Sequence, residues 1–126
     1  PLIDHLVIGR ELAAQLSGKS NLPDMATSLC GKNRTCCIVT AGEEGCWYSI
    51  HGEPALHAPG FKVNVVDTTG CGDVFHGAYA AALARGEPIG QAVKLANASA
   101  ALKATQIGGR LGIPDLVALQ RFLCER

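Results

Sequence analysis

Short β-branched, apolar runs alternate along this chain with segments that carry apolar residues at helical spacing, and this alternation restricts the fold more than any other feature. Residues 35–40, Thr-Cys-Cys-Ile-Val-Thr, are typical of a central strand, and an expected strand at 3–8 runs directly into an expected helix at 10–16. Strands that alternate with helices favour the α/β class. We therefore predict one globular α/β domain over residues 1–126.

The remaining elements are predicted from the same periodicities. Residues 45–58 indicate a hairpin with its turn near Gly52, and residues 62–66 indicate a further strand, so the sheet is expected to be antiparallel in part, or mixed. Further helices are expected at 23–29, from Asp73 to Gly86, at 89–107 and at 114–123.

Charge and hydropathy narrow the class of partner. Eleven basic and eleven acidic residues cancel, and no basic run is present, so we expect neither nucleic acid nor a membrane surface as a partner, but a small molecule. The apolar stretches are too short to span a membrane and residues 1–10 lack the pattern of a signal peptide, so a soluble, cytoplasmic protein is expected.

Cysteine and histidine spacing argues against a metal centre or a disulfide framework. The six cysteines include no CxxC pair, and we interpret most of them as reduced, buried, small apolar residues. His5, His51 and His57 lack the spacing of metal ligands and are expected to be strand or loop residues.

The segment with the clearest chemistry is Asp67-Thr-Thr-Gly70-Cys71-Gly72-Asp73, which precedes an expected helix. A helix start presents unpaired N–H groups and positive potential, and glycines let a ligand approach the backbone, so an anion is the expected occupant. A carboxylate there is useful if a proton must be removed during phosphoryl transfer to a hydroxyl. The alternative is that Asp73 is the N-cap of the helix, because Asp is a favourable capping residue.

The run 67–73, with Gly77-Ala78 after it, resembles the second signature of the PfkB, or ribokinase-like, carbohydrate kinases. The resemblance implies a three-layer α/β/α fold, of which this chain is the C-terminal, catalytic and ATP-binding portion with a mixed sheet. It also implies that Gly70, Cys71, Gly72 and Asp73 form an anion hole, with Asp73 as the base. Cys71 stands where the family usually has Ala.

The same resemblance assigns a nucleotide pocket and a cation site. Asn97 resembles the residue that lines the adenine pocket, although a lone Asn on a helix is more often solvated or locally bonded. The loop resembling the family's nucleotide-binding Gly-x-x-Gly loop, which by itself is often only a turn, consists of Thr40, Ala41, Gly42, Glu43, Glu44 and Gly45. The predicted monovalent-cation site, for K⁺, consists of Asp67, Thr69, Gly108 and Gly112.

ATP and Mg²⁺ are therefore the expected cofactors and a sugar the expected substrate, with ribose, fructose, a keto-deoxy acid and a nucleoside all open. A homodimer is compatible with the resemblance. The family's Asn-x-x-Glu element, which helps to organise magnesium, would fall on residues 9–12 and does not match, although Glu11 could substitute if the register slips by one. Members of the family are about twice as long or more and take most sugar contacts from the N-terminal half, so a nucleotide-binding module without turnover is the alternative.

Two other chemistries are weaker alternatives. Residues 13–20, ending in Gly18-Lys19-Ser20, resemble a Walker A loop with Ala in the first position, but the segment is expected to be helical where the loop requires a strand before it. Cys71 at a helix start could have a lowered pKa and act as a nucleophile, but His76 would not share its helix face.

Overall fold

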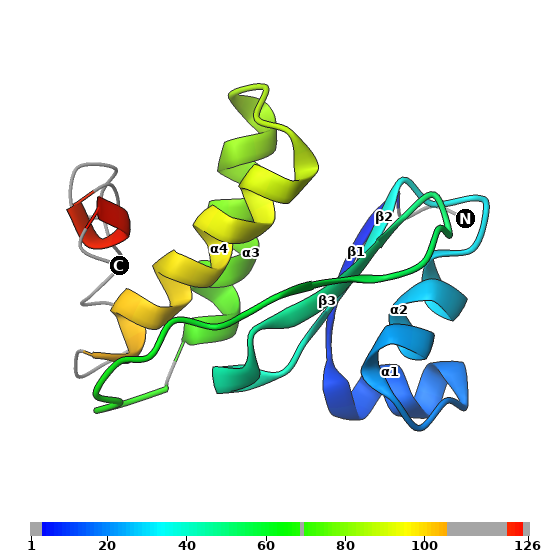
Figure 1. The fold of residues 1–126 in the computed structure, drawn as a ribbon, viewed down its shortest axis with the longest axis horizontal. Coiled ribbons are helices and arrows are strands. Elements are labelled where there is room, and N and C mark those ends of the chain that lie inside the picture. The colour runs from blue at the N-terminus through cyan, green and yellow to red at the C-terminus, as the bar shows by residue number, and fades with distance from the viewer. Residues whose placement is uncertain (1–3, 69, 106–120, 125–126) are drawn as a thin grey trace. The chain divides into compact units, whose positions relative to one another are not determined.

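The structure, a computed structural model, describes residues 4–68, 70–105 and 121–124. It divides the chain into two compact units, Pro1–Pro59 and Gly60–Arg126. In chain order the elements, drawn in Figure 1, are β1 (His5–Gly9), α1 (Arg10–Ser17), α2 (Leu22–Cys30), β2 (Cys36–Thr40), the 3₁₀ turn η1 (Gly42–Glu44), β3 (Cys46–Ile50), β4 (Leu56–Ala58), α3 (Cys71–Ala84) and α4 (Ile89–Ala104).

The first unit contains a mixed four-stranded sheet in the order β1-β2-β3-β4. β1 and β2 are parallel, with His5 opposite Cys36, and α1 and α2 form the crossover between them. β2, β3 and β4 pair antiparallel through successive hairpins. The predicted mixed sheet and the predicted hairpin over 45–58 are therefore confirmed.

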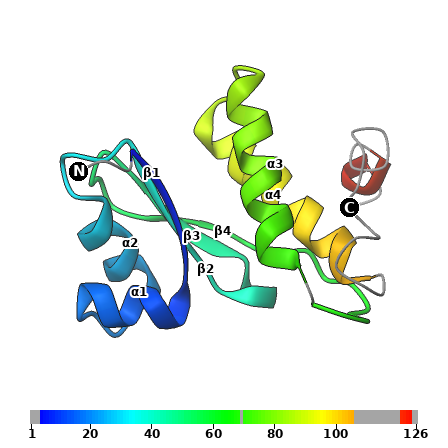
Figure 2. The same cartoon turned by 180° about the vertical axis from the view of Figure 1, so that it is seen from behind.

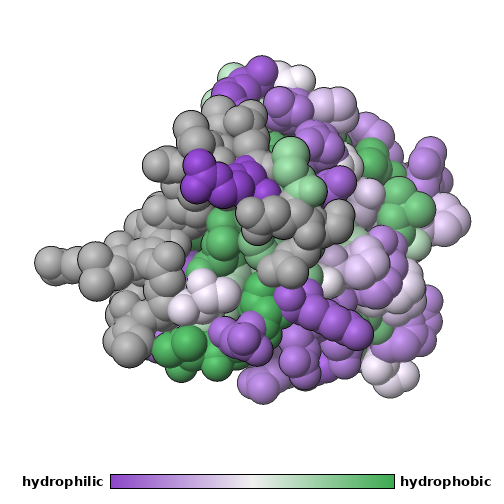
Figure 3. Space-filling model, turned by 60° about the vertical axis from the view of Figure 1, so that its left-hand side comes forward, coloured by the Kyte–Doolittle hydropathy of each residue, from purple (hydrophilic) through white to green (hydrophobic). Residues whose placement is uncertain are grey.

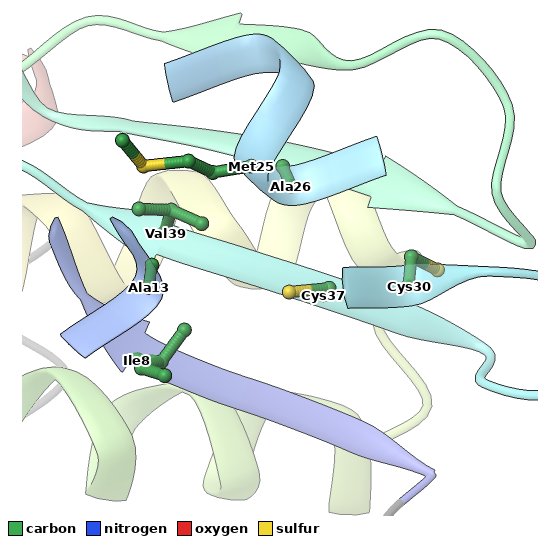
Figure 4. Packing of buried hydrophobic residues seen from close by; sticks show 7 residues of the cluster. All are labelled: Ile8, Ala13, Met25, Ala26, Cys30, Cys37 and Val39. Atoms are coloured by element: carbon green, nitrogen blue, oxygen red, sulfur yellow. The ribbon is translucent and has the colours of Figure 1, made fainter. Parts of the chain in front are cut away.

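α1 and α2 pack against one face of this sheet, where they form the core of the unit (Figures 1 and 2). Because side chains alternate along a strand, Cys37 and Val39 of β2 both face these helices. The buried cluster is shown in Figure 4 and consists of Ile8, Ala13, Met25, Ala26, Cys30, Cys37 and Val39. Burial of each larger side chain in this cluster stabilises the unit by roughly 1.5–3 kcal/mol.

α2 begins where its sequence predicts a helix start. Asn21 is the N-cap, and its side-chain oxygen accepts a hydrogen bond of 2.9 Å from the amide of Asp24. Pro23 lies in the first turn, where its missing N–H leaves no helical hydrogen bond unmade. These two residues end the preceding loop and direct the apolar face of α2 onto the sheet.

The predicted strand at 62–66 is wrong. The segment has no strand structure, and the side chains of Val65 and Val66 are 54% and 56% exposed. The amides of Val66 and Asp67 donate to the carbonyl of Ala104, at 2.7 and 3.1 Å, at the end of α4. β-branched residues favour a strand only where a neighbouring strand supplies partners, and here a helix end accepts the hydrogen bonds instead.

The second unit is built on α3 and α4, which pack against each other (Figures 1 and 2). α3 begins at Cys71, two residues before the predicted start. α4 ends at Ala104 with Thr105 as its C-cap, and the rest of its predicted range, to 107, lies outside the described residues. Residues 121–124 are helical, in agreement with the described part of the helix predicted at 114–123.

Figure 3 shows hydrophilic residues interleaved with smaller groups of hydrophobic ones on one face of the molecule. None of the helices in the described residues is long and apolar enough to cross a membrane. Large exposed apolar side chains are scattered over several elements: Leu12, Leu16, Leu56, Val65 and Val66.

Candidate functional site

The start of α3 is a helix terminus whose backbone is open to a ligand. Gly70 is the N-cap and has a left-handed backbone with φ of 79°, a conformation that side chains disfavour. Its carbonyl accepts from the amide of Val74 at 3.0 Å, and the amide of Cys71 bonds to Thr68 O at 3.2 Å. No side chain among the described residues caps this terminus. The first turn therefore presents helix N–H groups that an anion could accept from.

Gly72 and Asp73 complete this turn and are both exposed. A Cβ added to Gly72 would meet no atom within 4 Å, and its φ lies outside the left-handed range, so neither packing nor conformation requires glycine there. Asp73 is the third residue of α3, while the N-cap is Gly70. The alternative that Asp73 is the N-cap is therefore wrong, because the glycine takes that position.

The surroundings of the Cys71 thiol do not activate it as a nucleophile. Its thiol donates weakly to the carbonyl of Ala100 on α4, at 3.5 Å. Burial raises the pKa of Cys71, with the nearby Lys103 charge opposing the shift and Asp67 adding to it. The lowered pKa required by the thiol alternative is therefore not found. His76 does not turn to the thiol either, since its Nδ1 donates to the carbonyl of Gly72 at 2.8 Å.

The predicted nucleotide loop lies in the first unit, between β2 and β3. It is closed by hydrogen bonds from the Ala41 amide to the Gly45 carbonyl, at 2.8 Å, and from the Gly45 amide to the Gly42 carbonyl, at 3.0 Å. Glu43 and Glu44 are both exposed, so their charges lie at the surface of the unit. The loop is thus a tight, internally bonded turn with acidic side chains at its surface.

His57 supports this loop, a role that the sequence did not indicate. Its Nε2 lies 2.9 Å from the carbonyl of Glu44, and its ring stacks on Trp47 with centroids 4.5 Å apart. The contact depends on the pairing of β3 with β4, which puts Trp47 opposite His57. The pairing of Trp47 with His57 is not encoded in a local sequence motif, so it becomes apparent only in the folded sheet.

Asn97 and Asp67 belong to the second unit, with the start of α3. Asn97 is buried in α4, at 8% exposure, so the alternative of a solvated Asn is wrong. Asp67 lies beside the end of α4, where its amide bonds to the Ala104 carbonyl. The other predicted cation ligands, Thr69, Gly108 and Gly112, lie outside the described residues.

The magnesium and Walker A expectations fall on α1. Gly9 is the N-cap of α1 and Glu11 is exposed in its first turn. Within the described residues, no group of three or more His, Cys, Asp or Glu side chains could hold a metal ion. Gly18 is the left-handed C-cap of α1, with its amide bonded to Ala14 O, so residues 13–20 end a helix and cannot form the strand-to-helix loop of a Walker A motif.

Comparison with known proteins extends these observations. The sequence profile of the pfkB family carbohydrate kinases matches residues 1–116. The chain is 36% identical over 125 residues to the 2-dehydro-3-deoxygalactonokinase of Haloferax volcanii, covering 98% of this chain and 39% of that protein. It is 42% identical over 86 residues to the ribokinase of Bacillus subtilis, covering 68% and 29%. The chain thus spans well under half the length of these relatives.

Solved structures similar to this one are kinases as well. The ribokinase of Thermotoga maritima superposes with a TM-score of 0.85 at 32% identity, over 96% of this chain and 42% of that one. The Arabidopsis thaliana ribokinase complexed with ribose and ATP gives 0.84 at 26%, over 96% and 41%. The Vibrio cholerae fructokinase bound to fructose, ADP and calcium gives 0.83 at 27%, over 95% and 41%. These similarities confirm the predicted ribokinase-like α/β fold.

Proposed function

The chain belongs to the pfkB family of carbohydrate kinases, and from this premise we propose that it carries the catalytic and nucleotide-binding part of an ATP-dependent kinase. The acceptor is a hydroxyl group of a sugar or of a sugar-like alcohol. The observation that carries the proposal is the start of α3, where no side chain in the described part of the chain caps the helix, Gly72 is exposed, and Asp73 is an exposed acidic residue in the first turn.

The proposed chemistry assigns one task to each part of this turn. The sugar oxygen attacks the γ-phosphorus of ATP, and the bond from that phosphorus to the β–γ bridging oxygen breaks, releasing ADP. Asp73 takes the proton of the attacking hydroxyl, because a carboxylate beside the nucleophile removes that proton as the new bond forms. The N–H groups of residues 70–73 are assigned to the oxygens of the transferring group, whose charge they stabilise. The Cys71 amide, bonded to Thr68 O at 3.2 Å in this structure, would exchange that bond for a phosphate oxygen.

The nucleotide is proposed to contact residues 40–45 and Asn97. The ATP bound to the similar Arabidopsis ribokinase supports a nucleotide as ligand. The tight turn between Ala41 and Gly45 exposes residues 42–44, and Asn97 offers a buried amide that can both donate and accept hydrogen bonds. Both features suit recognition of a polar, planar ligand beside a phosphate chain.

A divalent cation, Mg²⁺, is proposed to accompany ATP, and the calcium in the similar Vibrio fructokinase supports this. The metal is proposed to be held mainly by phosphate oxygens and water, because Mg²⁺ usually keeps several waters and binds through few protein carboxylates. Glu11 is the protein carboxylate assigned to it. When bound, the metal supplies neutralisation of the phosphate charge.

The substrate is proposed at the level of its class. The relatives act on, or are bound to, different sugars: a dehydro-deoxygalactonate, ribose and fructose. All are polyhydroxylated compounds of similar size with a hydroxyl that can accept a phosphoryl group. A panel of such sugars is therefore the appropriate set of acceptors.

The test replaces Asp73 with Asn, which keeps the shape of the side chain and removes its basicity. We expect Asp73→Asn to lower ADP formation about 10²- to 10⁴-fold while ATP binding persists. Glu53→Gln, at an exposed acidic residue in the β3–β4 connection, is the matched control. The assay measures ADP release with the sugar panel, in this chain and in any longer encoded protein that contains it.

Unchanged turnover in Asp73→Asn would disprove the assignment of the base. The alternative function is nucleotide binding without turnover. ATP binding with no ADP release from any sugar, in the chain and in the longer protein alike, would support that function.

A further inference from the structure

Lys103 is a buried cation for which the described residues offer no partner. The residue is on α4, its exposed fraction is 0%, and its Nζ has no hydrogen-bond partner among residues 4–68, 70–105 and 121–124. An ammonium group removed from water without a compensating acceptor is strongly unfavourable. A side chain of this kind therefore calls for a functional explanation.

Lys103 lies on the part of α4 that contacts the proposed anion site at the start of α3. One turn earlier, the Ala100 carbonyl accepts from the thiol of Cys71, the first residue of α3. One residue later, the Ala104 carbonyl accepts from the amides of Val66 and Asp67. Lys103 thus lies between two contacts that join the end of α4 to residues 66–71.

The electrostatics agree with this placement. The positive charge of Lys103 favours the thiolate of Cys71, while Asp67 opposes it, so both charges are felt at the first residue of α3. The same region is where Asp67 was predicted to help to hold K⁺. A second cation beside Asp67 would be repelled by the ammonium group, so Lys103 and Asp67, which the structure describes in this region, do not fit a bound monovalent cation.

We propose that the ammonium group of Lys103 supplies, from within the chain, the positive charge expected from a monovalent cation, so that phosphate groups bind at the start of α3 without K⁺. The proposal rests on the proposed function, because the ligand is the phosphate chain of the nucleotide. Lys103 acts as a positioning residue: it offsets the Asp67 carboxylate electrostatically and leaves the glycine backbone to contact the anion.

The test measures ADP affinity by calorimetry in K⁺ and in tetramethylammonium at equal ionic strength, the latter being too large to enter a cation site. The unmodified chain is expected to bind ADP equally well in both. Lys103→Met, which keeps the length of the side chain and removes its charge, is expected to bind roughly tenfold more weakly or worse in tetramethylammonium, and to recover in K⁺. Lys94→Met, at an exposed lysine of the same helix, is the control and should change neither affinity.

A requirement for K⁺ in the unmodified chain would overturn the proposal, and this measurement needs no variant. Equal ADP affinity of Lys103→Met and the unmodified chain in tetramethylammonium would overturn it too. Failure of the unmodified chain to bind ADP in either buffer would instead contradict the proposed function, and this proposal with it. A purely structural lysine would change stability without any dependence of ADP affinity on the cation.

Discussion

Gly70 and Gly72, two residues apart at the start of α3, are glycines for different physical reasons. Gly70 has φ of 79°, so a side chain there would strain the backbone. Gly72 has room for a Cβ, yet glycine in a helix is less stable than alanine by roughly 1 kcal/mol. The stability lost at Gly72 is explained if a ligand approaches its backbone.

Gly72→Ala is therefore expected to stabilise the chain by up to ~1 kcal/mol while weakening ADP binding, because the methyl group lies where the phosphate approaches. Gly77→Ala is the matched control, since Gly77 is an exposed glycine in the same helix with nothing within 4 Å of an added Cβ. It should stabilise similarly and leave ADP affinity unchanged. Urea unfolding and ADP titration measure the two effects, and equal ADP affinity in both variants would argue against a phosphate at Gly72.

Asp73 shows why one residue's role needed the structure. Asp is favourable both as an N-cap and within the first turn, so its identity does not distinguish the two positions. Gly70, with its left-handed backbone, is the N-cap, so α3 begins at Cys71 and Asp73 is the third helical residue. Asp73 is therefore an exposed residue of the first turn, and its carboxylate does not cap the helix.

At the scale of elements, the turn between β3 and β4 is packed against the end of α2. A Cβ on Gly52, which has φ of 79°, would lie 2.6 Å from the carbonyl oxygen of Gly31, the C-cap of α2. The amide of Gly52 also lies 3.3 Å from the thiol of Cys30. The hairpin and the helix therefore meet backbone to backbone, and no side chain fits between them.

Gly52→Ala is expected to destabilise the chain by clearly more than Gly18→Ala. Gly18, with φ of 70°, has a similar left-handed backbone but no atom within 4 Å of an added Cβ, so it measures the conformational cost alone, about 1–2 kcal/mol. The excess in Gly52→Ala reports the clash with Gly31. Equal losses in urea unfolding for the two variants would show that this close approach is absent in solution.

Across the whole molecule, most of the cysteines are buried core residues. Cys30, Cys36, Cys37 and Cys46 are buried free thiols, as the sequence predicted for most of the six, whereas Cys71 is half-buried and Cys124 is exposed. Burial raises the pKa of Cys37 from 9.0 to about 12. A strand core that excludes water thus holds this thiol protonated well above its ordinary range.

This shift predicts how stability depends on alkaline pH. Below pH 9 the Cys37 thiol is protonated in both the folded and the unfolded chain, so it adds no pH dependence. Between pH 9 and about 12 only the unfolded chain releases the proton, so the free energy of unfolding falls as pH rises. Cys37→Ala should remove this part of the slope, measured by urea unfolding from pH 8 to ~11. The exposed Cys124→Ala variant should keep the slope, and an identical slope in Cys37→Ala would contradict the raised pKa.

The α/β class, the positions of most helices and strands, and the glycine-carboxylate turn at 70–73 could be predicted from the amino-acid sequence, because they depend on side-chain periodicity and on local backbone preferences. Three features could not be predicted in this way: the hydrogen bond from Val66 to the end of α4, the contact of His57 with the Glu44 carbonyl, and the burial of Lys103. Each of these features depends on which segment, distant in the sequence, packs beside the residue. Hydrogen-bond partners and burial are set by that packing, and no local pattern in the chain encodes them.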